Sequence, residues 1–134
     1  MIPFRVHFQP GSSLYEQVVY AVKKALVSGQ MNPGDAFPSV RALSKELKIN
    51  PNTAHKVVTQ LISEGLLEVN VGVGTVVAAP GKSTAAERSR LLKDELEQLV
   101  VEAKKLGMPL EAVLDAVSWH WQRLETNEHA GVSK

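Results

Sequence analysis

The sequence predicts a mostly α-helical protein with a small β wing, followed by a C-terminal tail of two helices. Three observations predict this fold class. Two helices separated by a short turn fill residues 39–64, and a β-prone stretch with central glycines follows directly at residues 66–78. Farther along, apolar residues in alternating steps of four and three mark a long helix between residues 84 and 107. A chain of 134 residues is long enough to bury a core of its own.

The overall charge favours no class of partner, since 22% of the residues are charged and the formal net charge is +1. The local charge is more informative. Residues 1–80 hold 7 Lys and Arg against 5 Asp and Glu, whereas residues 81–134 hold 8 against 9. Within residues 38–61, Glu46 is the only carboxylate. The cations in that stretch are Arg41, Lys45, Lys48 and Lys56.

Several classes of function are not expected. The chain has no cysteine, which excludes disulfides and thiolate catalysis and fits a reducing compartment. None of His7, His120 and His129 is followed by a second ligand three or four residues later, so we expect no metal and no cofactor. Nucleophile-elbow and phosphate-loop motifs are missing, so an enzyme is not expected. With no apolar run of membrane-spanning length and no signal-peptide layout, the expected location is the cytoplasm.

The N-terminal stretch predicts a strand and then a helix. Apolar residues at every second position from Ile2 to Phe8 predict a short edge strand. Ser13 and Glu16 match a capping box, and Gly29 ends the helix that this box begins. The apolar stripe of this helix is Leu14, Val18, Ala21, Val22, Ala25 and Leu26.

A turn at residues 32–35 leads into a predicted helix-turn-helix over residues 39–64. Ser39 can cap a short first helix. Asn50 followed by Pro51 combines a preferred N-cap residue with a proline at the first helical position, so it starts the second helix. Only about three residues separate the two helices, which favours a steep angle between them. The buried positions expected on the first helix are Val40, Leu43 and Leu47.

The second helix has one apolar face and one polar face. The core positions are Ala54, Val57, Val58, Leu61 and Ile62. The polar face of its first half holds hydrogen-bond donors and acceptors and no carboxylate before Glu64, which suits a polyanion. These residues are Asn52, Thr53, His55, Lys56, Thr59 and Gln60.

A β-hairpin is expected directly after this helix, which Gly65 ends. Residues 66–69 and 75–78 are β-prone, and residues 70–74 between them contain two glycines, as a hairpin turn requires. A helix-turn-helix followed by such a hairpin is a winged helix, whose wing reaches a neighbouring groove or the phosphates of DNA. We therefore expect a winged-helix domain over residues 1–79.

A linker at residues 80–84 separates this domain from a helical tail at residues 85–126. Thr84 and Glu87 match a second capping box, and the long helix that follows ends at Gly107. Because so short a tail cannot bury its own apolar face, we expect it to form a homodimer. The apolar seam of the long helix is Leu92, Leu96, Leu99, Ala103 and Leu106.

A final helix is expected after Met108 and Pro109, with a flexible polar tail at residues 127–134. Trp119 and Trp121 cannot both face one side of it. We assign Trp121 to the core side, and Trp119 covers either the dimer partner or a small pocket. The apolar positions of this helix are Leu110, Val113, Leu114, Val117, Trp121 and Leu124, of which Leu114, Val117 and Trp121 join the dimerisation seam.

Six stretches, which together span about half of the chain, follow a familiar order. They are LYEQV (14–18), residues 29–34, FPSVRAL (37–43), NPNT (50–53), LISEGLL (61–67) and GVGT (72–75). In this order they resemble the DNA-binding domain of the GntR family of bacterial transcription regulators. Residues 81–134 are too few for the large ligand-binding domains of most such regulators, and two helices in that place resemble the short YtrA-like branch. The resemblance implies dimers formed through the tail, and control of a transporter operon.

The resemblance also implies which residues contact DNA. Asn50 has a sufficient explanation as a helix cap, and Gly72 as a turn residue, so their DNA roles are shared ones. The sequence departs from the family at His55, which is commonly arginine and would contribute hydrogen bonding more than charge. It also departs at the wing residues Val71 and Val73, which are often basic or polar. The expected DNA-binding residues are Ser39, Arg41, Lys45, Asn50, Asn52, Thr53, His55, Lys56 and Gly72.

The function expected from these features is a sequence-specific DNA-binding regulator, a repressor that binds double-stranded DNA at an inverted repeat as a homodimer. The alternative is a winged helix that contacts an acidic protein without reading DNA. A small-molecule effector would need a cavity, for which the junction at residues 79–84 and the surroundings of Trp119 are candidates.

Overall fold

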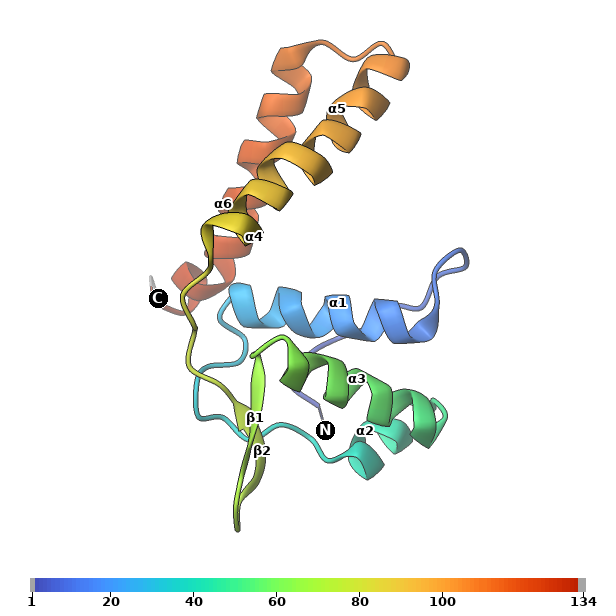
Figure 1. The fold of residues 1–134 in the computed structure, drawn as a ribbon, viewed down its shortest axis with the longest axis vertical. Helices are drawn as coiled ribbons and strands as arrows, with labels where there is room; N and C mark the ends of the chain where they lie inside the picture. Colours follow the sequence, from blue (N-terminus) through green and yellow to red (C-terminus); the bar gives the residue numbers. More distant parts are fainter. Residues whose placement is uncertain (1, 133–134) are drawn as a thin grey trace. The chain divides into compact units, whose positions relative to one another are not determined.

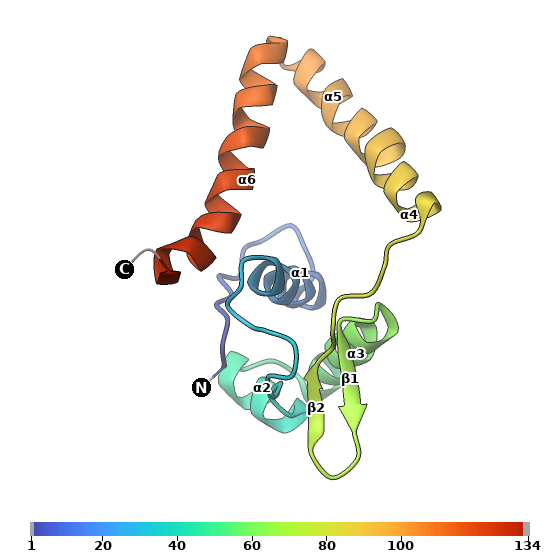
Figure 2. The ribbon, with the colours of Figure 1, turned by 90° about the vertical axis from the view of Figure 1, so that its left-hand side faces the viewer.

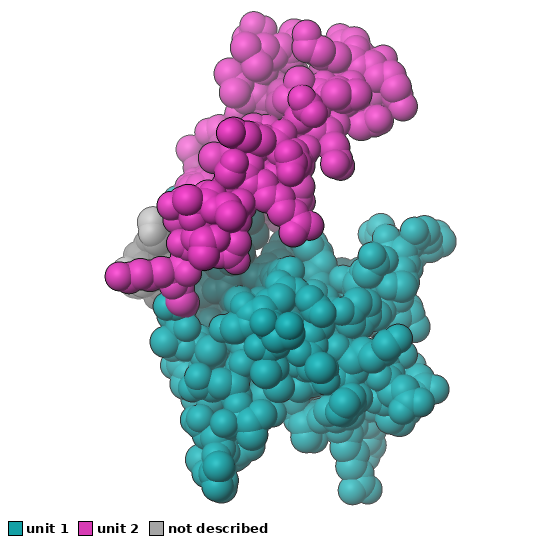
Figure 3. All heavy atoms as spheres, viewed as in Figure 1, with its two compact units in different colours: residues 1–80, 124–134 teal, residues 81–123 magenta. Residues whose placement is uncertain are grey.

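The computed structural model describes the backbone of residues 2–132 and the side chains of residues 2–125. The chain forms two compact units, coloured separately in Figure 3. One contains the residues up to Pro80 together with the end of the last helix from Leu124, and the other contains Gly81–Arg123.

Three helices and a two-stranded hairpin make up the first unit (Figure 1). They are α1 (Leu14–Val27), α2 (Val40–Leu47), α3 (Pro51–Ser63), β1 (Leu67–Asn70) and β2 (Gly74–Val77). The expected fold class, mostly helical with a small β wing, is confirmed.

The core of the first unit lies where α3 packs against both α1 and α2, with β1 beside α3. Leu43 and Leu61 are fully buried, whereas Val40 and Leu47, expected in the core of α2, are only partly buried. Ile62, also expected in the core, is exposed at 37%. The other core residues are Phe4, Val18, Val19, Val22, Ala25, Met31, Phe37, Ile49, Ala54, Val57, Val58, Leu67 and Val77.

Side chains cap these helices as the sequence predicts. The Oγ of Ser13 accepts from the N–H of Glu16 at 3.1 Å, and the Glu16 carboxylate accepts from the N–H of Ser13, so the capping box is complete. At α3, the Oδ1 of Asn50 accepts from the N–H of Asn52 at 2.7 Å, and Pro51 occupies the first turn. These starts are set by local chemistry.

The predicted edge strand at residues 2–8 is wrong. This segment has no regular secondary structure and no strand partner among the described residues. Phe4 is instead buried, with its ring stacked on Phe37 at 6.0 Å between centroids. The alternating pattern therefore marked a segment with one buried side that packs on the core without a β-ladder.

The hairpin is antiparallel, with Leu67 opposite Val77 and Asn70 opposite Gly74. Gly72 has φ +82° in the tight turn, a conformation that favours glycine. The N–H of Val73 donates to the carbonyl of Asn70 at 3.0 Å and closes the turn. The strands begin and end within one residue of the predicted bounds.

The second unit, Gly81–Arg123, begins at a short helix, α4 (Ala85–Ser89), with the predicted Thr84–Glu87 capping box. The single long α-helix expected here is interrupted, because six residues form the π-helix η1 (Arg90–Glu95) before α5 (Leu96–Lys105) continues. A π-helical turn holds more residues than an α-turn, so it shifts the side-chain register of the seam.

α6 (Leu110–Val132) follows the turn, and Figure 2 shows α5 and α6 diverging from it. The helical backbone continues past Thr126, although a flexible tail was expected at residues 127–134. The side chains of that tail, and residues 133–134 altogether, lie outside the described residues. No helix in the described part of the chain is long and apolar enough to cross a membrane.

Candidate nucleic-acid interface

The short connection between α2 and α3 is fixed by its own contacts. Three residues join the helices, as predicted. Ile49 is buried, its N–H donates to the carbonyl of Ser44 at 3.1 Å, and the Ser44 hydroxyl donates to the carbonyl of Ile49 at 2.7 Å. The beginning of α3 is therefore held in a defined orientation relative to α2.

α3 divides into a buried face and an exposed face. Ala54, Val57 and Leu61 are fully buried, and Val58 is 8% exposed. Asn52, His55, Lys56 and Thr59 lie at i, i+3, i+4 and i+7, so they share the opposite side of the helix, where all four are exposed. This face carries amide, imidazole, ammonium and hydroxyl groups and no carboxylate.

The C-terminal end of α3 is tied to α1. The Nζ of Lys23 lies 2.7 Å from an oxygen of Glu64, and the amide of Gln60 donates to the other oxygen at 2.6 Å. Partial burial raises the pKa of the Glu64 carboxyl, but the two hydrogen bonds and the charge of Lys23 together outweigh burial, so the pKa lies below its ordinary value. The contact holds the far end of the helix and leaves its first half exposed.

The first turn of α2 adds a second set of polar groups. Arg41 and Lys45 are exposed four residues apart, so they share one side of the helix. The Oγ of Ser39 accepts from the N–H of Ala42 at 3.1 Å. Its hydroxyl proton remains able to donate to an anion, as does the amide nitrogen of Asn50 at the start of α3.

Lys48 is a further exposed cation beside these residues. It is among the local cations named from the sequence but not among the expected DNA-binding residues. It ends α2 with φ +56° and ψ +46°, and it is the one described non-glycine residue with positive φ. Its side chain is exposed in the turn immediately before Asn50. A basic residue two positions before an N-cap is the signal that could have identified it.

The wing tip is apolar and exposed. Val71 is fully exposed, Val73 is 71% exposed and Val69 is 64% exposed. The only charged residue of residues 65–81 is Glu68. The wing therefore has no cation for phosphate, and Gly72 at its turn can offer only backbone groups.

The predicted residues thus lie on two helices that pack against each other, with Lys45 in the last turn of α2. Those on or beside α2 are Ser39, Arg41 and Lys45, and those at the start of α3 are Asn50, Asn52, Thr53, His55 and Lys56. Thr53 is only partly exposed, and the other seven are exposed. The tail residues expected in the dimer seam are mostly exposed as well, and Ala103 alone of them is buried. Trp121, assigned to the core side of α6, is 69% exposed, and Trp119 is 56% exposed with Arg123 over its ring at 4.9 Å.

Comparison with known proteins identifies the domain. The family described as "Bacterial regulatory proteins, gntR family" matches residues 14–77, which cover α1 through β2. The HTH-type transcriptional repressor YtrA of Bacillus subtilis (strain 168) is 37% identical, over 79% of this chain and 84% of YtrA. The uncharacterized HTH-type transcriptional regulator YhcF of the same organism is 30% identical, over 82% of this chain and 91% of YhcF.

Solved structures agree on the fold. A transcriptional antiterminator from Listeria monocytogenes EGD-e has a TM-score of 0.80 to this chain, with 22% identity over 91% of this chain and 92% of the other. The similarity to YtrA and YhcF includes part of the helical tail as well as the winged helix. The sequence match over α1 to the wing, with relatives of similar length, shows that this chain belongs to the gntR family of bacterial regulatory proteins and is YtrA-like.

Proposed function

We propose that this protein is a transcriptional repressor that binds an inverted-repeat operator in duplex DNA as a homodimer. The observation that carries the proposal is the exposed, carboxylate-free face at the start of α3, held beside the exposed Arg41 of α2. Membership of a family of regulatory proteins and similarity to a named repressor support it.

The residues of this face suit different parts of a DNA duplex. An arginine side chain can form a bidentate pair with guanine, and an asparagine amide can do so with adenine, so Arg41 and Asn52 are suited to reading bases in the major groove. Lys45, Lys48 and Lys56 would bind phosphates, which positions the protein without reading sequence. Ser39, Asn50, Thr53 and His55 add hydrogen bonds around them.

The tail at residues 85–126 would provide the dimer contact, with residues 80–84 as a linker to the winged helix at residues 1–79. Exposed leucines along α5 and apolar residues of α6 support this, since exposed apolar patches of this kind mark interaction surfaces. The residues proposed for the contact are Leu92, Leu96, Leu99, Ala103, Leu106, Leu114, Val117 and Trp121.

Two copies related by a two-fold axis would place their α3 helices in successive major-groove turns. The operator would then consist of two half-sites of opposite orientation. The resemblance to the YtrA-like branch supports a transporter operon as the regulated target.

Selection of duplexes from a random-sequence library tests the proposal. Repeated binding and recovery by the full chain should enrich one inverted repeat, and a gel-retardation titration should show two protein chains per duplex. Lack of binding to any duplex at low salt would overturn the proposal and favour a winged helix that binds a protein.

A further inference from the structure

A groove lies between α1 and the N-terminal segment, within the first unit and apart from the proposed DNA-binding face. It consists of two adjoining hollows of about 520 and 500 Å³. Arg5, His7, Ala21 and Lys24 line both of them, so the two hollows are neighbours. A volume of this size is in the range of pockets that hold small metabolites.

The segment that forms one wall of the groove is fixed at two points. Phe4 is 5% exposed and stacks on Phe37, which anchors one end in the core. At the other end, the side-chain amide of Gln17 donates to the carbonyl of Gln9 at 2.8 Å and accepts from its N–H at 2.9 Å. Arg5 and His7, which alternate with the packed residues Phe4 and Val6, are therefore held along the groove.

The chemistry of the groove is that of an anion site with an apolar side. Arg5 and Lys24 line it from opposite walls, one on the segment and one on α1. Its one carboxylate, Glu16, accepts hydrogen bonds from the N–H and hydroxyl of Ser13. The ring of Tyr20, with Ala21 and Val6, gives an apolar surface.

Backbone groups add to this site. No backbone hydrogen bond involves residues 5–8 in the described part of the chain, where they form neither helix nor strand. A backbone N–H group without a protein partner must donate to water or to a ligand. The N–H groups of residues 5–8 are therefore available to a bound ligand.

We infer that this groove binds a small organic phosphate, a phosphate monoester attached to a flat or apolar body. A phosphate monoester carries a charge of about −1.5 to −2 at pH 7, which matches the combined charge of Arg5 and Lys24. The guanidinium of Arg5 can donate two parallel hydrogen bonds to a phosphoryl group, with the ammonium of Lys24 as a point charge. The flat body would lie against Tyr20.

The phosphates of DNA are a less suitable source of this anion. In both views of the ribbon, α1 and the wing tip lie on opposite sides of α3 (Figures 1 and 2). A duplex held by the start of α3 and by the wing therefore lies on the side away from α1, which forms one wall of the groove. The inference does not depend on DNA binding, so either proposal can fail without the other.

NMR titration of the full chain with adenosine 5′-monophosphate tests the inference, with adenosine as the uncharged match. We expect saturable amide shifts confined to residues 5–8 and 16–24 with the phosphate, and none with adenosine. The double variant Arg5→Gln, Lys24→Gln should weaken binding by about tenfold or more, since it removes two charge-assisted contacts.

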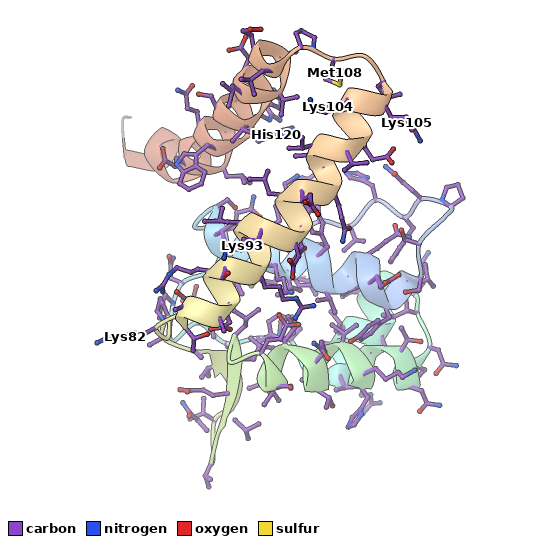
Figure 4. All side chains as sticks on the ribbon, turned by 45° about the horizontal axis from the view of Figure 1, so that its top comes forward. Lys82, Lys93, Lys104, Lys105, Met108 and His120 are labelled. Atoms are coloured by element: carbon purple, nitrogen blue, oxygen red, sulfur yellow. The ribbon has the colours of Figure 1, made fainter. Side chains whose placement is uncertain are left out.

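The double variant Lys93→Gln, Lys104→Gln is the matched control. Figure 4 shows Lys104 near the end of α5, close to the turn that contains Met108, and the two substitutions remove the same number of positive charges from the tail. Binding by this variant should equal that of the unaltered protein. Shifts spread over many surface lysines, equal binding by all variants, or no saturable shift at millimolar phosphate ester would each overturn the inference.

A DNA role for the groove would show itself differently. If Arg5 and Lys24 bind DNA phosphates, the double variant loses affinity for random duplex DNA and the salt dependence of binding becomes shallower. That result would overturn the small-ligand inference. Unchanged affinity for random DNA, together with loss of phosphate-ester binding, would support it.

Discussion

Leucine and valine make up similar proportions of the winged helix and of the tail, but they are mostly buried or partly buried in the first and mostly exposed in the second. In the first unit, Leu43 and Leu61 are fully buried and the core is continuous across three helices. In the tail, Leu96 and Leu99 are 40% and 50% exposed, although they fall on one seam of the helix. The winged helix therefore contains its own core, whereas the apolar seam of the tail is not buried within the tail itself.

The largest effect should come from the self-contained core. Leu61→Ala removes a fully buried side chain of α3 from the core of the first unit, and we expect it to lower the free energy of unfolding by about 2–5 kcal/mol. Chemical denaturation followed by circular dichroism measures this. The control is Val71→Ala at the fully exposed wing tip, which should change stability by less than about 0.5 kcal/mol. Equal losses would mean that burial does not distinguish these positions.

The next effect tests the surface of the tail. Leu96→Asp combined with Leu99→Asp places two charges in the proposed dimer contact, and we expect the dimer dissociation constant to rise by about a hundredfold, or roughly 2.7 kcal/mol. Sedimentation equilibrium measures the association. Val101→Asp, also exposed but off the seam, is the control. A monomeric unaltered protein, or a dimer that survives the double change, would contradict the role given to the tail.

A smaller effect is expected on the DNA-binding face. Arg41→Ala should cost about 1–3 kcal/mol of discrimination at one base pair of each half-site, because a bidentate contact to guanine is lost. Competition binding with operators altered at single positions measures it. Arg90→Ala, an exposed arginine of the tail, should leave discrimination unchanged. Equal loss of affinity for operator and random DNA would show that Arg41 binds phosphate only.

The smallest effect concerns the contact between α3 and α1. Folding lowers the pKa of Glu64 below its ordinary value of 4.5, so its contribution to stability is present above that pH and is lost as the pH falls through the folded-state pKa. At neutral pH, Glu64→Gln should lower the free energy of unfolding by about 0.2–1 kcal/mol, because the pair is partly exposed. The difference should disappear in acid.

A double-variant cycle provides the control for this contact. Lys23→Gln alone should lose a similar amount, and the combined variant should lose less than the sum of the two. Additive losses would show that the 2.7 Å contact contributes nothing measurable.

Features that depend on neighbouring residues in the chain were predictable from the sequence. The caps at Ser13, Ser39, Asn50 and Thr84 all form, because a side-chain oxygen reaches the free N–H groups of its own helix whatever else surrounds it. The hairpin formed for a similar reason, since its turn requires positive φ at Gly72.

Features that depend on distant residues were not predictable in the same way. Of the alternating residues at 2–8, Phe4 is buried and Ile2 and Val6 are partly buried, whereas Phe8 is exposed. Whether such a segment pairs as a strand depends on a free sheet edge, and Phe4 packs on Phe37 instead. The sequence predicted one continuous α-helix through Arg90–Glu95, and no capping or spacing rule marks the π-helix that interrupts it. The groove beside α1 combines Arg5 with Lys24, which no spacing rule connects.

The proposed DNA-binding face was predictable in part. Periodicity separated Asn52, His55 and Lys56 from the buried side of α3, because one helix determines that division. Lys48 was missed, although its place two positions before the N-cap Asn50 is visible in the sequence, and the structure adds its position in the turn.

Lys48 has a consequence for the design of such proteins. A left-handed conformation costs an ordinary residue roughly 1–2 kcal/mol, a strain that glycine does not experience. A chain selected for thermal resistance alone would have glycine at this turn, and the present chain keeps a positive charge there. Replacing Lys48 with glycine would relax the backbone, but it would also remove a cation next to the start of α3. Efforts to make this regulator more heat-tolerant should therefore begin in the core and leave Lys48 unchanged.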